Sequence, residues 1–165
     1  MHKAIAALTS AVITAVVISG AGVAAATTQP HTATIEHFQE VVASPTAHQA
    51  HVIAYGAFTA AGVDVENSNN TNTFKFPGGS FLVTPRYTVV SEHLNKSTCL
   101  LTQNLRLTYT ISHGTGKYAG ISGSGHGTLS DLEITARNSH SACSTRKIPL
   151  AQQVIGRGQG PVTLP

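Results

Sequence analysis

The chain has 165 residues, with ten Lys and Arg against seven Asp and Glu and a formal net charge of +3. These charges are spread along the sequence, whereas binding to nucleic acid or to a membrane surface needs basic residues concentrated on one face. We therefore expect neither partner for this protein.

The first 26 residues have the plan of a secretory signal peptide. Lys3 gives a positive start, residues 4–18 form a mostly apolar run, and residues 24–26 are three alanines that supply a cleavage signal. Polar residues weaken the run and no charge stops transfer after it, which argues against an uncleaved membrane anchor. We predict cleavage after Ala26 and a secreted, extracellular protein with no membrane segment after cleavage.

The segment that follows the predicted cleavage point is rich in Thr, Ala, His and Gln. It holds one short apolar pattern, which fits either a helical turn or an irregular strand. The members of this pattern are Ile35, Phe38, Val41 and Val42.

Period-two alternation of apolar residues begins at His51. "HVIAYGAFTAAG" at 51–62 alternates as a strand buried on at least one face does. The Asn-rich stretch "DVENSNNTNT" at 64–73 predicts a loop, because Asn and Asp side chains compete for backbone hydrogen bonds. "FKFPGGSFLV" at 74–83 predicts strand, turn and strand, and "RYTVVSEHL" at 86–94 predicts another strand.

The clearest strand is "LRLTYTISH" at 105–113, which has one apolar and one polar face, as in a sheet with one solvated side. Its apolar face consists of Leu105, Leu107, Tyr109 and Ile111. "TLSDLEITAR" at 128–137 predicts a second good strand. In that strand we expect Leu132, Ile134 and Ala136 to point inward and Glu133, Thr135 and Arg137 to point outward.

About seven short strands, separated by turn chemistry, predict an all-β fold, either an antiparallel barrel or a sandwich. Aromatic residues make up 5% of the chain and Trp is absent, so we expect a core of Val, Ile, Leu and Ala. We assign residues 27–50 to an N-terminal extension and residues 51–165 to a single antiparallel β-barrel domain of about eight strands.

Two cysteines, Cys99 and Cys143, remain after the predicted leader. Because an exported protein meets an oxidising compartment, we predict that they form one disulfide, which chain-entropy arithmetic values at roughly 4 kcal/mol. The alternatives are two free thiols or half of a metal site. A metal site is disfavoured because no C-x-x-C is present.

The stretch "HGTGKYAGISGSGHGTL" at 113–129 contains six glycines. Their spacing excludes a P-loop, a dinucleotide-binding fingerprint and a nucleophile elbow, so we expect no cofactor. We expect Gly114 and Gly116 to form a hairpin turn. Three further glycines follow at period two: Gly123, Gly125 and Gly127. On a strand they would let a backbone or a large side chain approach one face closely.

Three stretches, "AYGAF" at 54–58, "FKFPGGSFLV" at 74–83 and "GTGKYAGISGSG" at 114–125, resemble those of secreted actinobacterial proteins with an allene oxide cyclase-like barrel. The similarity covers residues 50–136. It implies a calycin-type, dirigent-like barrel of eight antiparallel strands, often with an apolar cavity for a lipid-like or phenolic guest. In the plant relatives the barrel steers cyclisation or radical coupling, and many bacterial members have no assigned activity. No catalytic motif residue of the family matches here.

Histidines and a nucleophile triad are weak candidates for chemistry. His93, His113 and His126 could meet across strands and bind Zn or Cu, but their spacing fixes no ligand set and we expect no metal. A triad of His126 with Ser130 and Asp131 is not expected, because neighbours along a strand face opposite sides.

The carboxylates are expected to be mostly solvated, at loop or outer-face positions, which disfavours a pair of acids for glycoside hydrolysis. The positions in question are Glu36, Glu40, Glu66, Glu92 and Glu133. If the barrel holds a cavity, the polar side chains expected to orient a guest are Tyr55, Glu92, Arg106 and Tyr109.

Three hypotheses for function stay open. The leading one is a secreted barrel without a catalytic motif that binds a small apolar ligand. The second is an isomerase or cyclase of allene oxide cyclase or dirigent type that acts by confinement. The third is a surface interaction module with a filled core. A cavity would separate the first two from the third, and a buried acid or tyrosine with a shifted pKa at its floor would favour the enzyme.

Overall fold

A computed structural model describes residues 32–42, 44, 46 and 49–165 of the chain. The predicted signal peptide and its cleavage point lie outside the described residues. Within the described part, no helix is long and apolar enough to cross a membrane.

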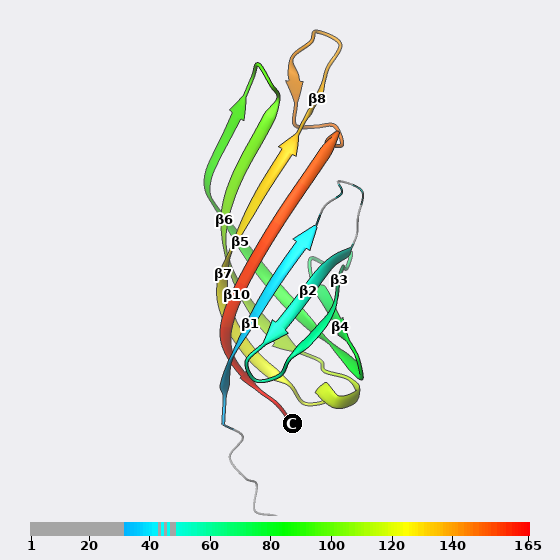
Figure 1. The fold of residues 1–165 in the computed structure, drawn as a ribbon, viewed down its shortest axis with the longest axis vertical. Coiled ribbons are helices and arrows are strands. Elements are labelled where there is room, and N and C mark those ends of the chain that lie inside the picture. Colours follow the sequence, from blue (N-terminus) through cyan, green and yellow to red (C-terminus); the bar gives the residue numbers. More distant parts are fainter. Residues whose placement is uncertain (1–31, 43, 45, 47–48) are drawn as a thin grey trace, which may run out of the picture.

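Eight antiparallel strands close into one barrel, in the order β1-β10-β7-β6-β5-β4-β3-β2 (Figure 1). The barrel strands are β1 (Thr34–Val42), β2 (Gln49–Tyr55), β3 (Ala60–Glu66), β4 (Asn72–Phe76), β5 (Gly79–Asn95), β6 (Leu100–Ser112), β7 (Ser122–Ile134) and β10 (Ala151–Thr163). A short 3-10 helix, η1 (Gly116–Tyr118), precedes β7, and a small hairpin of β8 (Ala136–Arg137) and β9 (Cys143–Ser144) precedes β10. This confirms the predicted all-β single barrel, which is compatible with a calycin-like architecture.

Strand β1 lies within the segment that the sequence assigned to an extension. It pairs with β10 on one side and with β2 on the other, and so closes the barrel. Its apolar pattern is therefore that of a strand, in which Phe38 is buried while Ile35 and Val41 are exposed. The predicted loop at 64–73 is also shorter than expected, because Asp64 belongs to β3 and Asn72 to β4.

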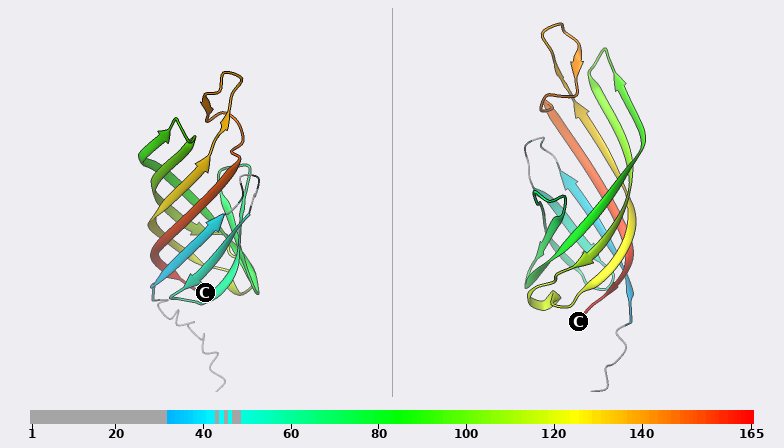
Figure 2. Two further views of the ribbon diagram at one scale, coloured as in Figure 1. Left: turned by 45° about the horizontal axis from the view of Figure 1, so that its top comes forward. Right: turned by 180° about the vertical axis from the view of Figure 1, so that it is seen from behind.

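The barrel is taller on one side than on the other. Strands β5, β6, β7 and β10, here called the tall wall, rise beyond the ends of β1 to β4 at one end of the barrel (Figures 1 and 2). The β8–β9 hairpin stands at the same end, opposite the C-terminus. Cys99 and Cys143 form a disulfide with a Cα–Cα distance of 5.3 Å, which confirms the predicted pairing and ties this hairpin to the β5–β6 turn.

An aromatic cluster, here called the aromatic plug, fills the other end of the barrel. It contains all five phenylalanines of the chain and two tyrosines, with ring centroids between 5.1 and 6.5 Å apart: Phe38, Phe58, Phe74, Phe76, Phe81, Tyr109 and Tyr118. The expectation of a core of Val, Ile, Leu and Ala is wrong. Few aromatic residues suffice to dominate a core when nearly all of them point into the same small barrel.

Glycines on two adjacent strands make room for these rings. Gly123, Gly125 and Gly127 of β7 face inward beside Gly156, Gly158 and Gly160 of β10, with Gly127 opposite Gly158 in the register. A methyl group at Gly125 would overlap the Tyr109 ring, and one at Gly158 would lie 3.0 Å from it. The predicted close approach of a large side chain to the glycine face is thus confirmed. The predicted simple hairpin turn is instead a longer connection that includes η1, with Gly116 at a φ of 57°.

The inward face of β7 differs from the prediction beyond these glycines. Leu132 and Ile134 are 40% and 38% exposed, whereas Asp131 and Thr135 are buried. Because odd-numbered residues face inward from Gly123 onward, Asp131 and Glu133 continue the inner face of the barrel. The apolar residues that suggested the opposite orientation lie on the outer surface.

Candidate functional site

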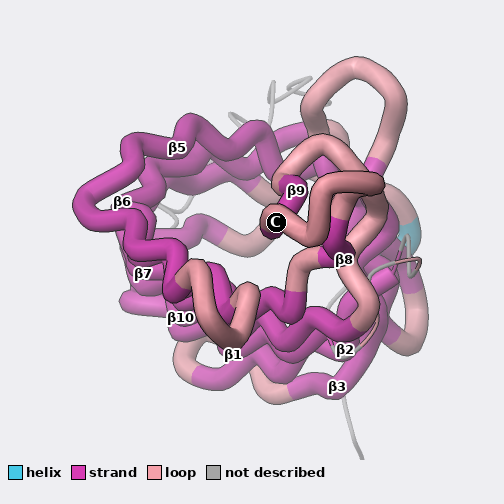
Figure 3. Tube along the Cα trace, turned by 90° about the horizontal axis from the view of Figure 1, so that it is seen from above, coloured by secondary structure: helices cyan, strands magenta, loops and turns pink. Residues whose placement is uncertain are grey.

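The barrel interior is hollow above the aromatic plug. A narrow cavity of about 40 Å³ next to the plug adjoins a wider one of about 310 Å³ at the rim formed by the ends of the short strands. Figure 3 shows the ring of strands from this end. The two cavities share the residues Glu40, Asp64, Asn72, Pro85, Tyr87 and Leu129.

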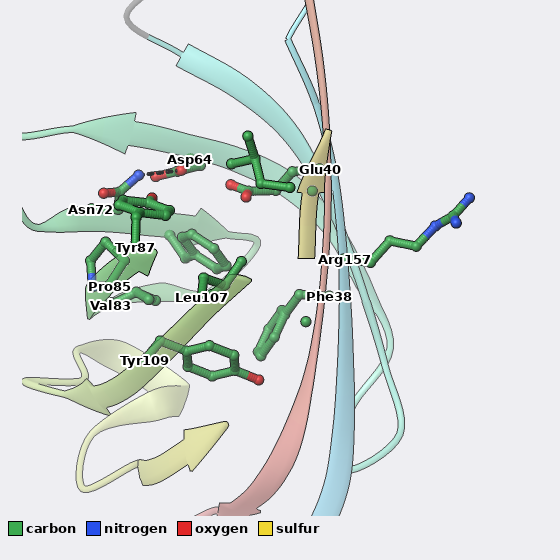
Figure 4. Close-up of a pocket in the computed structure, with 14 residues that line it drawn as sticks. Phe38, Glu40, Asp64, Asn72, Val83, Pro85, Tyr87, Leu107, Tyr109 and Arg157 are labelled. Atoms are coloured by element: carbon green, nitrogen blue, oxygen red, sulfur yellow. Dashed lines mark hydrogen bonds between the residues drawn. The ribbon is translucent and has the colours of Figure 1, made fainter. Parts of the chain in front are cut away.

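Two carboxyl groups meet where the cavities join. Glu40 on β1 and Asp64 on β3 both point inward, on either side of β2, which places the small residues Val52 and Ala50 beside them in the register. Gly156 of β10 lies opposite Glu40 and leaves space for its side chain. Figure 4 shows both carboxyl groups on the same side of the pocket, above the Phe38 ring.

Each carboxyl group changes the pKa of the other. Burial, followed by the hydrogen bond and the negative charge of Asp64, raises the pKa of Glu40 to about 9. Burial also raises the pKa of Asp64, while hydrogen bonds from Glu40 and Asn72 oppose that rise. The Asn72 side-chain amide donates to Asp64 Oδ2. At neutral pH, Glu40 is therefore the protonated member of the pair and donates to the Asp64 carboxylate.

Tyr109 places an unpaired hydroxyl group at the floor of the cavity. Its side chain is 5% exposed, it lines the narrow cavity, and its Oη has no hydrogen-bond partner. Burial, followed by the charge of Glu36, raises its pKa to about 12. Tyr109 is thus a neutral donor whose buried hydroxyl hydrogen has no acceptor among the residues that the structure describes.

A third carboxyl group, Glu36, is fully buried on β1. Its Oε2 accepts a hydrogen bond of 3.0 Å from the Phe58 backbone amide, and Oε1 has no partner. Burial raises its pKa, and backbone hydrogen bonds partly offset the rise. The expectation that the glutamates occupy loop or outer-face positions is therefore wrong for Glu36 and Glu40, and also for the other three, which lie on the inner faces of strands: Glu66, Glu92 and Glu133.

The structure separates the four side chains predicted to orient a guest. Tyr109 lies in the lumen, while Tyr55 and Arg106 border a shallow groove of about 510 Å³ on the outer surface. There the Tyr55 ring stacks on His37 with centroids 4.9 Å apart. Glu92 lies on the tall wall, where it accepts a hydrogen bond from the Gln103 amide.

Sequence reasoning missed Glu40, Asp64 and Asn72. One signal in the sequence could have found Glu40. Glu36, Phe38 and Glu40 are spaced two residues apart, so on a strand both glutamates lie on the same face as the apolar Phe38. No comparable signal marks Asp64, which lies in the polar stretch that predicted a loop.

Among the described residues, no three His, Cys, Asp or Glu side chains are grouped as a metal site would require. His93, His113 and His126 are all exposed. Comparisons with known protein families, with characterised proteins and with solved structures find no significant match to this chain.

The raised pKa of Glu40 predicts that the protein becomes less stable as the pH rises from about 5 to 9. A carboxyl group whose pKa is higher in the folded state holds a proton that the unfolded chain has released, so folding loses up to about 1.4 kcal/mol per pH unit in this window. Urea unfolding followed by circular dichroism at several pH values measures this slope.

Glu40→Gln should flatten the slope between pH 5 and 9, whereas Glu92→Gln, which removes an exposed carboxyl group, should retain it. An unfolding free energy of the wild type that increases with pH across this range would contradict the assignment.

Proposed function

We propose that this protein binds a small molecule, mainly apolar or aromatic, in the upper half of its barrel. The observation that carries the proposal is the cavity of about 310 Å³ that remains above the aromatic plug. Its size falls at the lower end of the 300–1,000 Å³ range of small-molecule sites. Apolar parts of its wall come from Val42, Ala50, Pro85, Leu129 and Val154.

The plug and the cavity divide the barrel interior between two roles. The lower half is closed by packed rings and supplies the stability of the fold, in the way that small barrels are filled by side chains. The upper half ends on Phe38 and Tyr109, which form an aromatic floor for a guest. Tyr109 and Asp64 both line the cavity, and each has a buried oxygen atom without a hydrogen-bond partner among the described residues. Such unpaired groups are costly, and a protein that acted only through its outer surface would have no use for them.

A second candidate function is an isomerase or cyclase of the allene oxide cyclase or dirigent type, which the sequence resemblance suggested. One observation favours it: Glu40, whose pKa is raised to about 9, faces the same cavity as Asp64, the more acidic member of the pair. A neutral acid next to a carboxylate base could move a proton on a confined substrate. Binding ranks first because it requires only the cavity, whereas catalysis also requires that this pair transfers a proton to a substrate.

The proposal includes export from the cell. Its support is the signal-peptide plan of residues 1–26 together with the Cys99–Cys143 disulfide, because disulfides persist in oxidising compartments.

Native mass spectrometry of the protein recovered from the secreting host tests export and binding together. We expect a chain that begins at Thr27, a mass lower than the reduced form by two hydrogen atoms, and an additional population that retains a small molecule. Recovery of only the full-length, reduced protein from cells would refute the export proposal.

Filling the cavity mouth should abolish binding. Val154→Trp places a large ring in the wide cavity, whereas Gln153→Trp places the same ring on the outer face of β10 as a matched control. With 1-naphthylmethanol as the probe, we expect at least about a tenfold loss of affinity for Val154→Trp and none for Gln153→Trp. Equal affinities in calorimetry for both variants would place the binding site outside the lumen.

The enzyme hypothesis makes a different prediction about the retained molecule. Incubated with fresh protein, the extracted molecule should be converted to an isomer that chromatography resolves, and Glu40→Gln should lose this conversion while still binding it. A molecule that returns unchanged from both proteins would leave binding as the function.

A further inference from the structure

All seven Asp and Glu side chains lie on the inner surface of the barrel or of its tall wall. Asp64 pairs in the register with the buried Phe74, and Glu66 pairs with Asn72, which lines both cavities. The complete set is Glu36, Glu40, Asp64, Glu66, Glu92, Asp131 and Glu133.

The tall wall continues this acidic surface above the rim. Glu92 is opposite Gln103, and Gln103 is opposite the buried Asp131 on the next strand. Gln152 of β10 donates to both Asp131 and Glu133, at distances of 3.0 to 3.3 Å. The donors to these inner carboxylates are neutral amides, as is Asn72 for Asp64, so they leave the negative charge uncompensated.

The positive charges lie elsewhere. Of the ten Lys and Arg residues, Lys3 is outside the described part and the other nine are all exposed. Arg157 is the one that borders the narrow cavity, and Figure 4 shows its side chain pointing away from the pocket. The interior is therefore acidic while the exterior is basic, a separation that the small net charge of the chain conceals.

Two buried polar groups in the cavity lack a partner. Asp64 is 6% exposed, and its Oδ1 has no hydrogen-bond partner among the described residues. The Tyr109 hydroxyl is unpartnered at the cavity floor. A buried carboxylate is costly unless a hydrogen-bond donor or a positive charge compensates it. In this site, a ligand can supply the missing donor or charge.

We infer that the ligand of this lumen carries a protonated amine, which is held by Glu40 and Asp64 where the two cavities meet. The inference deepens the proposed function and rests on it. The apolar body of the ligand lies in the wide cavity against Leu129 and Val154, and the ammonium group points toward the plug. An ammonium group supplies both the charge and the hydrogen-bond donors that the neutral amides do not.

An organic ammonium ion fits this site better than a metal ion does. Calcium takes six to eight oxygen ligands, and the described residues include no group of three metal-ligating side chains. An apolar wall next to two carboxyl groups matches a molecule that is apolar at one end and cationic at the other.

Three probes with the same aromatic body and different charge test the inference: 1-naphthylmethylamine, 1-naphthylmethanol and 1-naphthaleneacetate. Calorimetry at neutral pH should show that the amine binds the wild type at least about tenfold more tightly than the alcohol, and that the acetate binds most weakly. The affinity for the alcohol measures the contribution of the apolar cavity alone. The difference between the affinities for the amine and the alcohol measures the contribution of the positive charge.

Removing the charged member of the pair should remove the preference for the amine. Asp64→Asn should bring the affinity of the amine to within about threefold of that of the alcohol, while the affinity for the alcohol persists. Glu40→Gln replaces a carboxyl group that is protonated at neutral pH by a neutral amide, so it should keep most of the preference. Glu92→Gln, a matched removal of a carboxyl group that borders neither cavity, should keep most of the preference. Circular dichroism verifies the fold of each variant, and the comparison of the three probes on the wild type carries the test if Asp64→Asn does not fold.

The outcomes separate this inference from the proposed function. Equal affinity of the wild type for the amine and the alcohol would overturn the inference and leave the binding function intact. A preference for the amine that survives in Asp64→Asn would overturn the assignment of the charge to this pair. Failure of all three probes to bind would refute binding of aromatic guests in the lumen itself.

Discussion

The inward face of two adjacent strands, β7 and β10, carries glycine at six positions, and the rest of the interior depends on the space this creates. A closed eight-stranded barrel is just wide enough for side chains to fill. With no side chains on one part of its wall, rings from the opposite strands can cross the lumen, and Tyr109 comes to lie against Gly125 and Gly158. The aromatic plug is the result, and it fixes the floor of the cavity.

The same constraint explains how the cavity obtains its polar groups. Gly156 opposite Glu40 leaves room for a long carboxyl side chain to turn inward, and small residues on β2 allow Asp64 to approach it. Burying two carboxyl groups side by side is costly, and protonation of Glu40 relieves only part of this cost. Hydrophobic residues of similar size would stabilise such a barrel more, so the pair is more easily understood as a binding feature than as a structural one.

The tall wall extends the chemistry of the cavity beyond the barrel rim. Its inner face carries Glu92, Asp131 and Glu133 with amide partners, while its outer face carries exposed apolar residues such as Leu132 and Ile134. The disulfide joins the hairpin next to this wall to the β5–β6 turn and so holds the upper end of the molecule together. A ligand that approaches the mouth therefore passes an acidic surface first.

The sequence by itself determined the all-β class, the alternation of the clearest strand at 105–113, the disulfide pairing and the role of the period-two glycines, because all of these depend on local spacing or on residue chemistry. The tertiary structure decided which face of a strand points inward. Leu132 and Ile134 point outward, and Glu40 points inward, because barrel closure and the register with neighbouring strands fix that choice. The contact of Glu40 with Asp64 likewise arises only when β2 brings two distant strands together, since a period of two defines faces but not what lies across the lumen.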